Sequence, residues 1–247
     1  MKLSDYFVDD NGAVSFDAEQ ASAFAKGVAG DFNPLHDPDN KRFCVPGDLL
    51  FCVLINRYGL AQTTNVQFSG MLDDKTRMHL PASVDEQVHI VDDRNKQLLI
   101  LHLNGFRIND YAFNQTLSAL YVKFSGKTFP DILVPLMRSA NVMINPERPL
   151  VIYKDMSIEL NAQAAAAIDS GSVELDLAID DTDISINGRK AAVRLRFLIT
   201  SAGRTLGEGE KNMVLGGLRE YDESAMQNII DLYSKWRESY LERELSA

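Results

Sequence analysis

The sequence is poor in the residues that mark disulfide-stapled, fibrous and low-complexity proteins. Only 2 of its 247 residues are cysteine, which excludes a disulfide framework and favours a reducing compartment. With 15 glycines and 8 prolines, the chain is neither collagen-like nor of low complexity. No stretch reaches the roughly 18 uninterrupted apolar residues of a membrane span. What remains is a globular protein, and its hydrophobic fraction of 45% is ordinary for that class.

Basic side chains are also scarce. Lys and Arg number 25 against 35 Asp and Glu, so the formal charge is −10, and we expect no nucleic acid partner because such a surface repels phosphate backbones. The first twenty residues have neither the basic start nor the apolar core of a signal peptide, which predicts a cytoplasmic protein. No glycine-rich phosphate loop is present, and the acidic residues at 37 and 39 lack the glycine and glutamate spacing of a calcium loop. Neither a cofactor nor a metal is therefore expected.

The pattern of apolar residues predicts an α+β chain in which one order of elements occurs twice. A capped helix over residues 17–29 precedes a helix over residues 47–58 that is apolar nearly all round and therefore buried. Further helices are predicted at residues 132–144 and 222–245. Strands are predicted at residues 66–71, 76–80, 87–91, 97–106, 111–124, 150–160, 173–179, 190–200 and 205–214, with a hairpin turn at Asn187-Gly188. This repeated order predicts two domains, residues 1–127 and 128–247.

One short segment, residues 30–36 with the sequence GDFNPLH, carries the residues of an acid–base site. Pro34 moves Asn33 out of helical geometry, so Asp31 and His36 lie on an irregular loop that can aim both side chains at one point. A carboxylate and an imidazole that share one water form an acid–base pair. The alternative is a loop whose Asp and Asn only cap and turn the backbone.

The run AGDFNPLH resembles the [S/A]-G-D-x-N-P-[L/I]-H motif of the MaoC-like (R)-specific enoyl-CoA hydratases. The resemblance to that family covers residues 15–125 specifically. Residues 130–220 resemble only a hot-dog domain without the motif. The resemblance implies a double hot-dog fold: two antiparallel sheets, each wrapped around a central helix, that lie side by side as one continuous or pseudo-continuous surface. The central helices would be residues 47–58 and 131–144, followed by a C-terminal helix.

The resemblance also implies an activity, the hydration of a trans-2-enoyl thioester to the (R)-3-hydroxyacyl thioester or its reverse. Asp31 and His36 match the catalytic pair, and Asn33 matches the asparagine that supports the loop. Gly47 matches the glycine at the start of the central helix, whose N–H binds the thioester oxygen. The implied partner is an acyl-CoA or another acyl thioester, and a homodimer is possible.

Other residues near the motif are candidates for binding substrate. Lys41 and Arg42 follow it directly and are expected at the CoA phosphates, unless they are an ordinary solvated pair, and Phe32 is expected at the substrate. The short segment between His36 and Gly47 departs from the family, as does Asp48, whose carboxylate would compete with an oxyanion if it capped the helix. These departures favour a catalytically silent acyl-CoA-binding or regulatory protein as the alternative. A hot-dog thioesterase is the third hypothesis.

Overall fold

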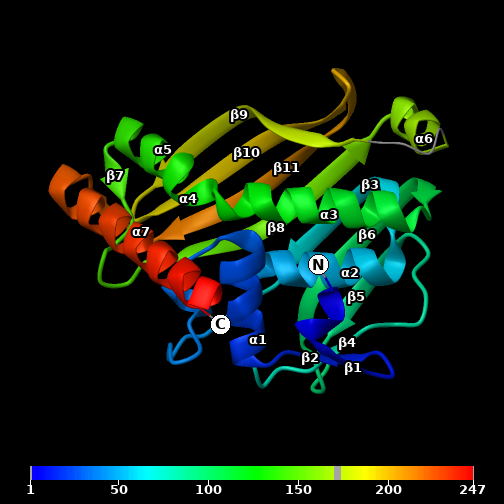
Figure 1. Ribbon diagram of the computed structural model, residues 1–247, viewed down its shortest axis with the longest axis horizontal. Coiled ribbons are helices and arrows are strands. Elements are labelled where there is room, and N and C mark those ends of the chain that lie inside the picture. Colours follow the sequence, from blue (N-terminus) through cyan, green and yellow to red (C-terminus); the bar gives the residue numbers. More distant parts are fainter. Residues whose placement is uncertain (1, 170–173, 247) are drawn as a thin grey trace.

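Ten antiparallel strands form one continuous sheet in the computed structural model, which describes residues 2–169 and 174–246 (Figure 1). The strands, in their order across the sheet, are β1 (Val8–Asp10), β2 (Ala13–Ser15), β4 (Met78–His79), β5 (Gln87–Val91), β6 (Gln97–Ile108), β3 (Leu60–Phe68), β8 (Val151–Leu160), β11 (Arg204–Gly216), β10 (Lys190–Ser201) and β9 (Asp176–Asn187). Two short strands, β7 (Val142–Met143) and β12 (Arg219–Glu220), pair separately.

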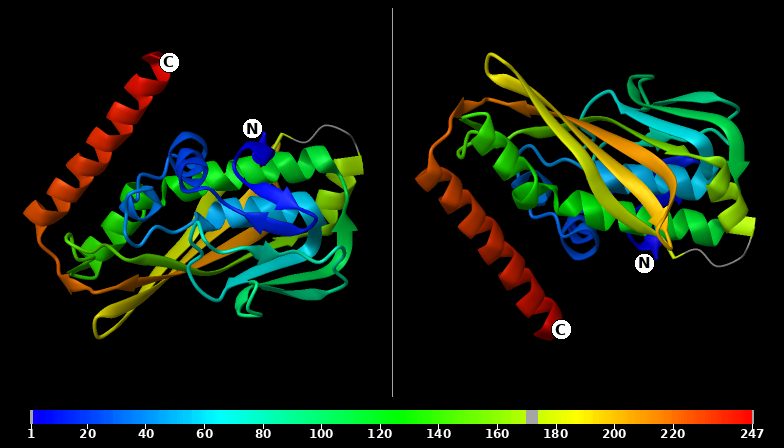
Figure 2. Two further views of the ribbon diagram at one scale, coloured as in Figure 1. Left: turned by 90° about the horizontal axis from the view of Figure 1, so that it is seen from below. Right: turned by 90° about the horizontal axis from the view of Figure 1, so that it is seen from above.

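Helices gather on one face of this sheet (Figure 2). The helices are η1 (Leu3–Asp5), α1 (Ala18–Ala23), η2 (Phe24–Ala29), η3 (Pro34–His36), α2 (Gly47–Tyr58), α3 (Tyr111–Gly126), α4 (Thr128–Asp131), α5 (Leu133–Ser139), α6 (Ala162–Asp169) and α7 (Glu223–Ser246). Within the described part of the chain, no helix is long and apolar enough to cross a membrane.

The strands follow the same order on each side of the central β3–β8 pair. On one side α2 leads into β3, and the last of the following strands, β6, returns to pair with β3. On the other side β8 comes after α3 to α5, and the last of the following strands, β11, returns to pair with β8. Residues 63–67 of β3 pair with residues 155–159 of β8, so the sheet is unbroken between the two sides.

Helix α2 confirms the buried helix expected from the sequence. It spans Gly47–Tyr58, and its residues 48–55 are all buried. Helix α3 lies beside it, and Phe51 of α2 meets Tyr121 of α3 edge to face at 5.0 Å between ring centroids (Figure 1). The first core therefore forms between the two helices and the sheet, where aromatic contacts add to the burial of apolar surface.

The prediction of a strand at residues 111–124 is wrong, because this segment is the helix α3. Asp110 caps it by accepting a hydrogen bond from the N–H of Phe113 at 2.7 Å. Its buried side chains Phe113, Leu117 and Tyr121 recur every fourth residue, which is helical spacing. The aromatic and branched residues of the segment favour a strand locally, but packing on α2 decides for the helix.

The expected second central helix over residues 131–144 is also wrong. That segment breaks into α4, α5 and the short strand β7, and it packs in a second core with α7. The helix that lies beside α2 is α3 instead (Figure 1).

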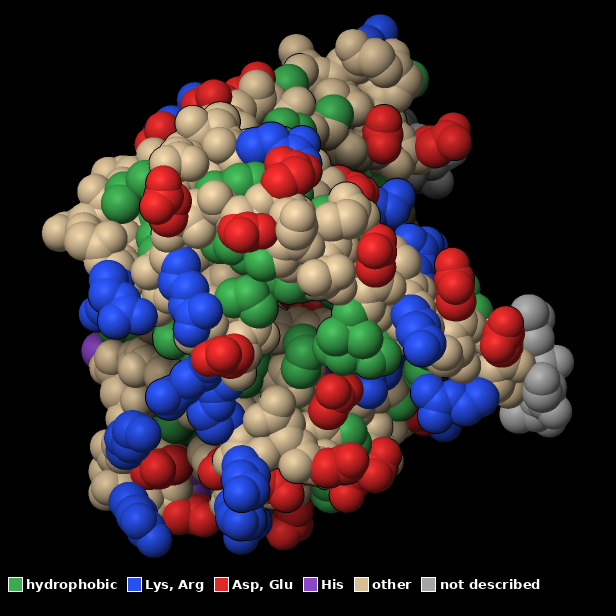
Figure 3. All heavy atoms as spheres, turned by 90° about the vertical axis from the view of Figure 1, so that its left-hand side faces the viewer, with side chains coloured by type: hydrophobic (Ala, Val, Ile, Leu, Met, Phe, Trp, Pro, Cys, Tyr) green, Lys and Arg blue, Asp and Glu red, His purple; other side chains and the backbone are tan. Residues whose placement is uncertain are grey.

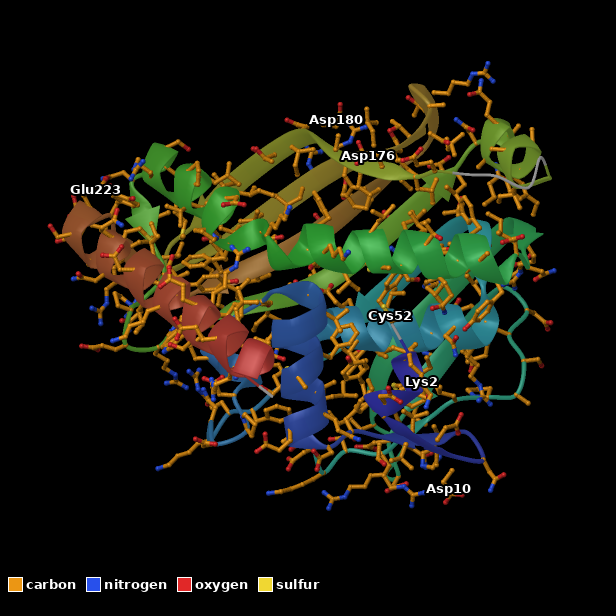
Figure 4. The ribbon with its side chains drawn as sticks, in the orientation of Figure 1. Lys2, Asp10, Cys52, Asp176, Asp180 and Glu223 are labelled. Atoms are coloured by element: carbon orange, nitrogen blue, oxygen red, sulfur yellow. The ribbon has the colours of Figure 1, made fainter. Side chains whose placement is uncertain are left out.

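Most of the other predicted strands are present, although β3 begins at Leu60 rather than at residue 66, and β9 runs to Asn187 rather than ending at residue 179. The predicted start of the latter strand, residue 173, lies outside the described residues. The Asn187-Gly188 turn joins β9 to β10, and the tail forms α7, which stands out from the body in both views of Figure 2. At the far edge of the sheet, β9 carries exposed acidic side chains, among them Asp176 and Asp180 (Figure 4). Charged side chains on an edge strand oppose pairing with another sheet.

Replacing Gly126 with alanine should destabilise the protein, because a Cβ at this position would lie 1.8 Å from the carbonyl oxygen of Ala29. We expect a loss of about 1–3 kcal/mol in the free energy of unfolding, the usual range for overpacking. Gly70→Ala is the matched control, because a Cβ there meets nothing within 4 Å. Thermal or urea unfolding of the two variants measures the difference, and equal stability would contradict the close contact.

Candidate active site

The loop between η2 and α2 brings Asp31 and His36 together at the edge of a cavity. The Oδ2 atom of Asp31 lies 3.6 Å from Nε2 of His36, and both side chains are largely buried. The Nδ1 atom of His36 lies 2.7 Å from the carbonyl oxygen of Cys44, to which it donates. That bond turns Nε2 toward Asp31, so the two reactive groups of the motif face one another.

Local hydrogen bonds shape the loop that holds this pair. The last turn before the loop, η2, is wider than an α-helical turn, and such turns are frequent at functional sites. It ends at Gly30, whose φ of 74° is left-handed and suits glycine. The carboxylate of Asp31 accepts from the N–H of Asn33 at 2.9 Å, and Asn33 in turn caps η3 by accepting from the N–H of Leu35. Asn33 therefore orients the loop rather than reaching into the pair.

Each member of the pair changes the pKa of the other. Burial alone would raise the pKa of the Asp31 carboxyl, but the interaction with His36 and the N–H of Asn33 lower it overall. Burial alone would lower the pKa of His36, but the interaction with Asp31 and the carbonyl of Cys44 raise it overall. The pair is thus stabilised as carboxylate and imidazolium.

The pair faces a cavity of about 340 Å³. Asp31 and His36 lie in its wall, and most of the remaining wall is apolar. The apolar wall is formed by Leu50, Phe68, Leu72, Phe129, Leu133, Val151, Met213, Ile229, Leu232 and Trp236, among others. Figure 3 shows one face of the molecule, which is hollowed near its centre and has hydrophobic side chains around the hollow. A small apolar ligand with one reactive polar end fits such a wall.

The first turn of α2 also lies in the cavity wall. Gly47 begins the helix, and no side chain in the described part of the protein caps its free N–H groups. A Cβ on residue 47 would lie 2.7 Å from the ring of Tyr153, so close packing requires glycine here as well. Asp48 does not cap this helix, because its carboxylate is turned toward α3.

Asp48 belongs to a buried polar cluster. Its Oδ2 accepts from the hydroxyl of Ser125, at the end of α3, at 2.5 Å. The Nζ of Lys211, on β11, donates to that same Ser125 oxygen. The hydroxyl of Tyr153, on β8, lies 2.8 Å from Ser125, and Lys211 sits 3.6 Å from the centre of the Tyr153 ring. Opposite charges are thus joined through one hydroxyl in the interior.

Burial dominates the acid–base properties of this cluster. It lowers the pKa of Lys211 to about 8, although Asp48 and Asp31 act in the opposite direction. Burial also raises the pKa of Asp48, with Lys211 and the Ser125 hydroxyl opposing it. Both groups are therefore closer to exchanging a proton near neutral pH than they would be in water.

The candidate binding residues are placed differently from one another. Arg42 lies in the cavity wall. Lys41 is exposed and outside that wall. Phe32 is buried away from the cavity, where its ring meets Tyr233 and Tyr240 of α7 edge to face. The structure therefore brings Asp31, Asn33, His36, Gly47 and Arg42 to one cavity, but not Lys41 or Phe32.

Sequence reasoning missed Ser125, Tyr153, Tyr233 and Lys211 in this region. Tyr233 of α7 accepts a hydrogen bond from the N–H of Phe32 and donates one to the carbonyl of Gly30, both at 3.1 Å, so it holds the backbone on each side of Asp31. Its partners lie about 200 residues away, so no local signal identifies them. Lys211 could have been found from the sequence. Side chains of a strand alternate between its two faces, and Lys211 lies on the face of β11 whose other side chains are buried.

Among the described residues, no three His, Cys, Asp or Glu side chains lie close enough to hold a metal ion. The free thiols of Cys44 and Cys52 are poor nucleophiles, because burial raises the pKa of Cys44 to about 11 and raises that of Cys52 further. Cys52 lies on α2 within the body of the molecule (Figure 4).

The family model described as "Protein of unknown function (DUF3581)" matches residues 1–224. The chain belongs to this family. The DUF3581 match ends at the start of α7, so Tyr233 lies beyond the matched residues. No curated protein sequence matches the chain.

One solved structure shows the fold of this DUF3581 protein. A hot-dog protein from Alicyclobacillus acidocaldarius is similar with a TM-score of 0.50 at 10% identity, over 87% of this chain and 98% of the other. The chain therefore has an α+β hot-dog fold. A MaoC-like dehydratase gives a TM-score of 0.41 at 8% identity, over 85% and 98% of the two chains. A tesB protein from Mycobacterium avium subs paratuberculosis gives a TM-score of 0.41 at 10% identity, over 71% of this chain and 89% of the other.

Tyr233→Phe should loosen the loop around Asp31, because it removes the hydroxyl that satisfies the N–H of Phe32 and the carbonyl of Gly30. We expect a loss of about 1–3 kcal/mol in the free energy of unfolding. Hydrogen exchange at Phe32 should also become faster. Tyr111→Phe is the control, since that side chain is exposed. Unchanged exchange at Phe32 would contradict the role of Tyr233.

The Asp31–His36 pair should make stability depend on pH with a defined sign. The raised pKa of His36 gives stability that is present below about pH 6.5 and is lost as the pH rises through the folded value. The lowered pKa of Asp31 gives stability that is present above about pH 4 and is lost as the pH falls. The difference in unfolding free energy between wild type and His36→Gln should therefore be greatest near pH 5.

Urea unfolding of both proteins between about pH 3 and pH 9 measures this profile. The matched control is His79→Gln, which breaks the exposed contact of His79 with Asp93, 2.6 Å apart. That variant should change stability by only about 0–1 kcal/mol. If the difference in unfolding free energy between wild type and His36→Gln did not change with pH over this range, the buried pair would be contradicted.

Proposed function

We propose that this protein is an acyl-thioester hydratase or dehydratase that interconverts a trans-2-enoyl thioester and a 3-hydroxyacyl thioester. The observation that carries the proposal is the Asp31–His36 pair, held 3.6 Å apart in the wall of a mostly apolar cavity. The similarity of residues 29–36 to the MaoC-like motif supports it.

The charges of the pair divide the chemistry between its two members. In hydration, the Asp31 carboxylate takes a proton from water, and the oxygen of that water adds to carbon 3 of the enoyl group. The His36 imidazolium gives its Nε2 proton to carbon 2. Asp31 is then protonated and His36 neutral, and a proton passing from Asp31 to His36 restores the pair. Dehydration runs through the same steps in reverse.

The start of α2 suits the thioester oxygen. Negative charge develops on this oxygen while carbon 3 is attacked, and an uncapped N–H at a helix start is placed to stabilise it. Gly47 itself lies in the cavity wall. The apolar wall takes the acyl chain, and Arg42 at the rim suits a phosphate of CoA.

The same proposal includes a double hot dog. The strand order around the β3–β8 pair repeats on both sides, and α2 and α3 precede the two central strands. We assign α3 as the second central helix, which moves the division between the halves from residue 127 to the segment before Tyr111. The second half contributes Ser125, Tyr153 and Lys211 to the cavity region but no second acid–base motif.

An acyl-thioester-binding protein without hydratase activity is the second candidate. It is favoured by Asp48, whose buried Oδ1 has no hydrogen-bond partner among the described residues and lies in the first turn of α2. A carboxylate there opposes the negative charge that develops on the thioester oxygen. Such a protein would bind acyl-CoA and leave enoyl-CoA unchanged.

Asp31→Asn and His36→Gln should each lower enoyl-CoA hydration by about 10²–10⁴-fold, because each removes one acid–base group. The rate is followed through the loss of absorbance of the conjugated double bond, with enoyl-CoA of several chain lengths. His79→Gln should retain the wild-type rate, since it changes an exposed Asp–His pair outside the cavity.

A wild-type protein that binds acyl-CoA but hydrates none of these substrates would support the silent binding protein instead. Hydration that survives both Asp31→Asn and His36→Gln would place the chemistry elsewhere. Circular dichroism and thermal unfolding of each variant show that a lost rate is not lost folding.

A further inference from the structure

We propose that Ser125 is a nucleophile that accepts the acyl group of a saturated acyl thioester, with Asp48 as its base and Lys211 as the cation that stabilises its alkoxide. This second activity, thioester hydrolysis through an acyl-serine, rests on the proposed function only in using the same acyl-thioester cavity. It does not use the Asp31–His36 pair as its acid and base.

The hydrogen bonds around Ser125 have the directions that a nucleophile requires. Its hydroxyl donates to Oδ2 of Asp48 at 2.5 Å, so the proton already points at a carboxylate. Its oxygen accepts from the ammonium group of Lys211, which stabilises negative charge on that oxygen. A nucleophile bonded to a base, with a third group that fixes their geometry, is the common arrangement of covalent catalysis.

The position of Ser125 suits attack on a thioester that is bound in the cavity. Ser125 lies in the cavity wall, at the end of α3. Its contact with Asp48 places it beside the uncapped first turn of α2, where the N–H of Gly47 is available to an oxyanion. The thioester carbonyl can therefore meet the nucleophile and the oxyanion donor together.

Unpaired polar atoms in the same wall also point to a ligand. Asp48 Oδ1 and Thr128 Oγ1 are buried, belong to residues of the cavity wall, and have no hydrogen-bond partner among the described residues. Buried polar atoms are rarely left without partners. The hydration mechanism uses neither of them, nor does it use Lys211, which is 0% exposed. A buried lysine is tolerated when it is paired and hydrogen-bonded, and here its hydrogen bond goes to the Ser125 hydroxyl that also bonds to Asp48.

The reaction balances in two steps. In the first, the Ser125 O–H bond breaks, its proton moves to Asp48, and the oxygen bonds to the thioester carbon. The carbon–sulfur bond then breaks, the sulfur takes the proton from Asp48, and the free thiol of CoA leaves. In the second step Asp48 takes a proton from water, the water oxygen attacks the acyl-serine, and the carbon–Oγ bond breaks. Ser125 regains its proton, and the carboxylic acid is released.

The experiment uses the full chain and two probes. A saturated acyl-CoA such as hexanoyl-CoA has no double bond to hydrate, so release of free CoA, measured by chromatography, reports hydrolysis alone. An enoyl-CoA in a parallel assay reports hydration. We expect CoA release from hexanoyl-CoA by the wild type, and a hexanoyl adduct on Ser125 by mass spectrometry of peptides after rapid quenching.

Ser125→Ala should reduce CoA release to the uncatalysed background, whereas any loss of hydration should be much smaller. Asp48→Asn should lower CoA release by about 10²–10⁴-fold, as expected for loss of a base. Ser118→Ala is the matched control, because Ser118 is a buried serine on the same helix outside the cavity wall, and it should leave both rates unchanged.

The two proposals fail in different ways. Hydration without CoA release or adduct would overturn the Ser125 nucleophile and leave the hydratase. CoA release with a Ser125 adduct but no hydration would overturn the hydratase alone. CoA release that persists in a folded Ser125→Ala protein would also overturn the nucleophile, because water would then attack the thioester directly. The adduct is measured on the wild type, so the test stands even if a variant does not fold.

Discussion

The pairing of β3 with β8 is the constraint on which the rest of the molecule depends. Each of these strands is the first long strand after a helix of the core, so their pairing sets α2 beside α3. The start of α2 then meets the end of α3, and Asp48 reaches Ser125 although the two residues are 77 positions apart. Without this pair the sheet would divide in the middle, and the cavity would lose one of its walls.

Four ionisable groups lie at this junction, and their charges balance in pairs. Asp31 faces His36, and Asp48 is linked to Lys211 through Ser125. An isolated buried charge is very unfavourable, whereas a paired and hydrogen-bonded one is tolerated. The two pairs also interact electrostatically. Lys211 helps lower the pKa of Asp31, and Asp31 opposes the fall in the pKa of Lys211. A change in either pair is therefore expected to alter the protonation of the other.

Local features of the sequence predicted the parts of the site that are built locally. The apolar character of α2 and the Gly30–His36 loop depend on neighbours within a few residues, so both were identified from the sequence. The helix α3 was mistaken for a strand because its aromatic and branched side chains favour either element, and only its packing on α2 decides between them. The Ser125–Lys211 contact spans 86 positions, and no local pattern identifies such a partner.

The C-terminal helix shows how distant segments complete a loop that cannot satisfy itself. The left-handed turn at Gly30 leaves the carbonyl of Gly30 and the N–H of Phe32 without partners inside the loop, and buried backbone groups need partners. Tyr233 of α7 supplies both. Glu223 lies at the other end of the same helix (Figure 4), where it pairs with Arg138 of α5. Near the start of the helix, Met226 is buried in the second core, and the helix reaches the acid–base loop from there. The position of Asp31 therefore depends on the second core as well as on its own loop.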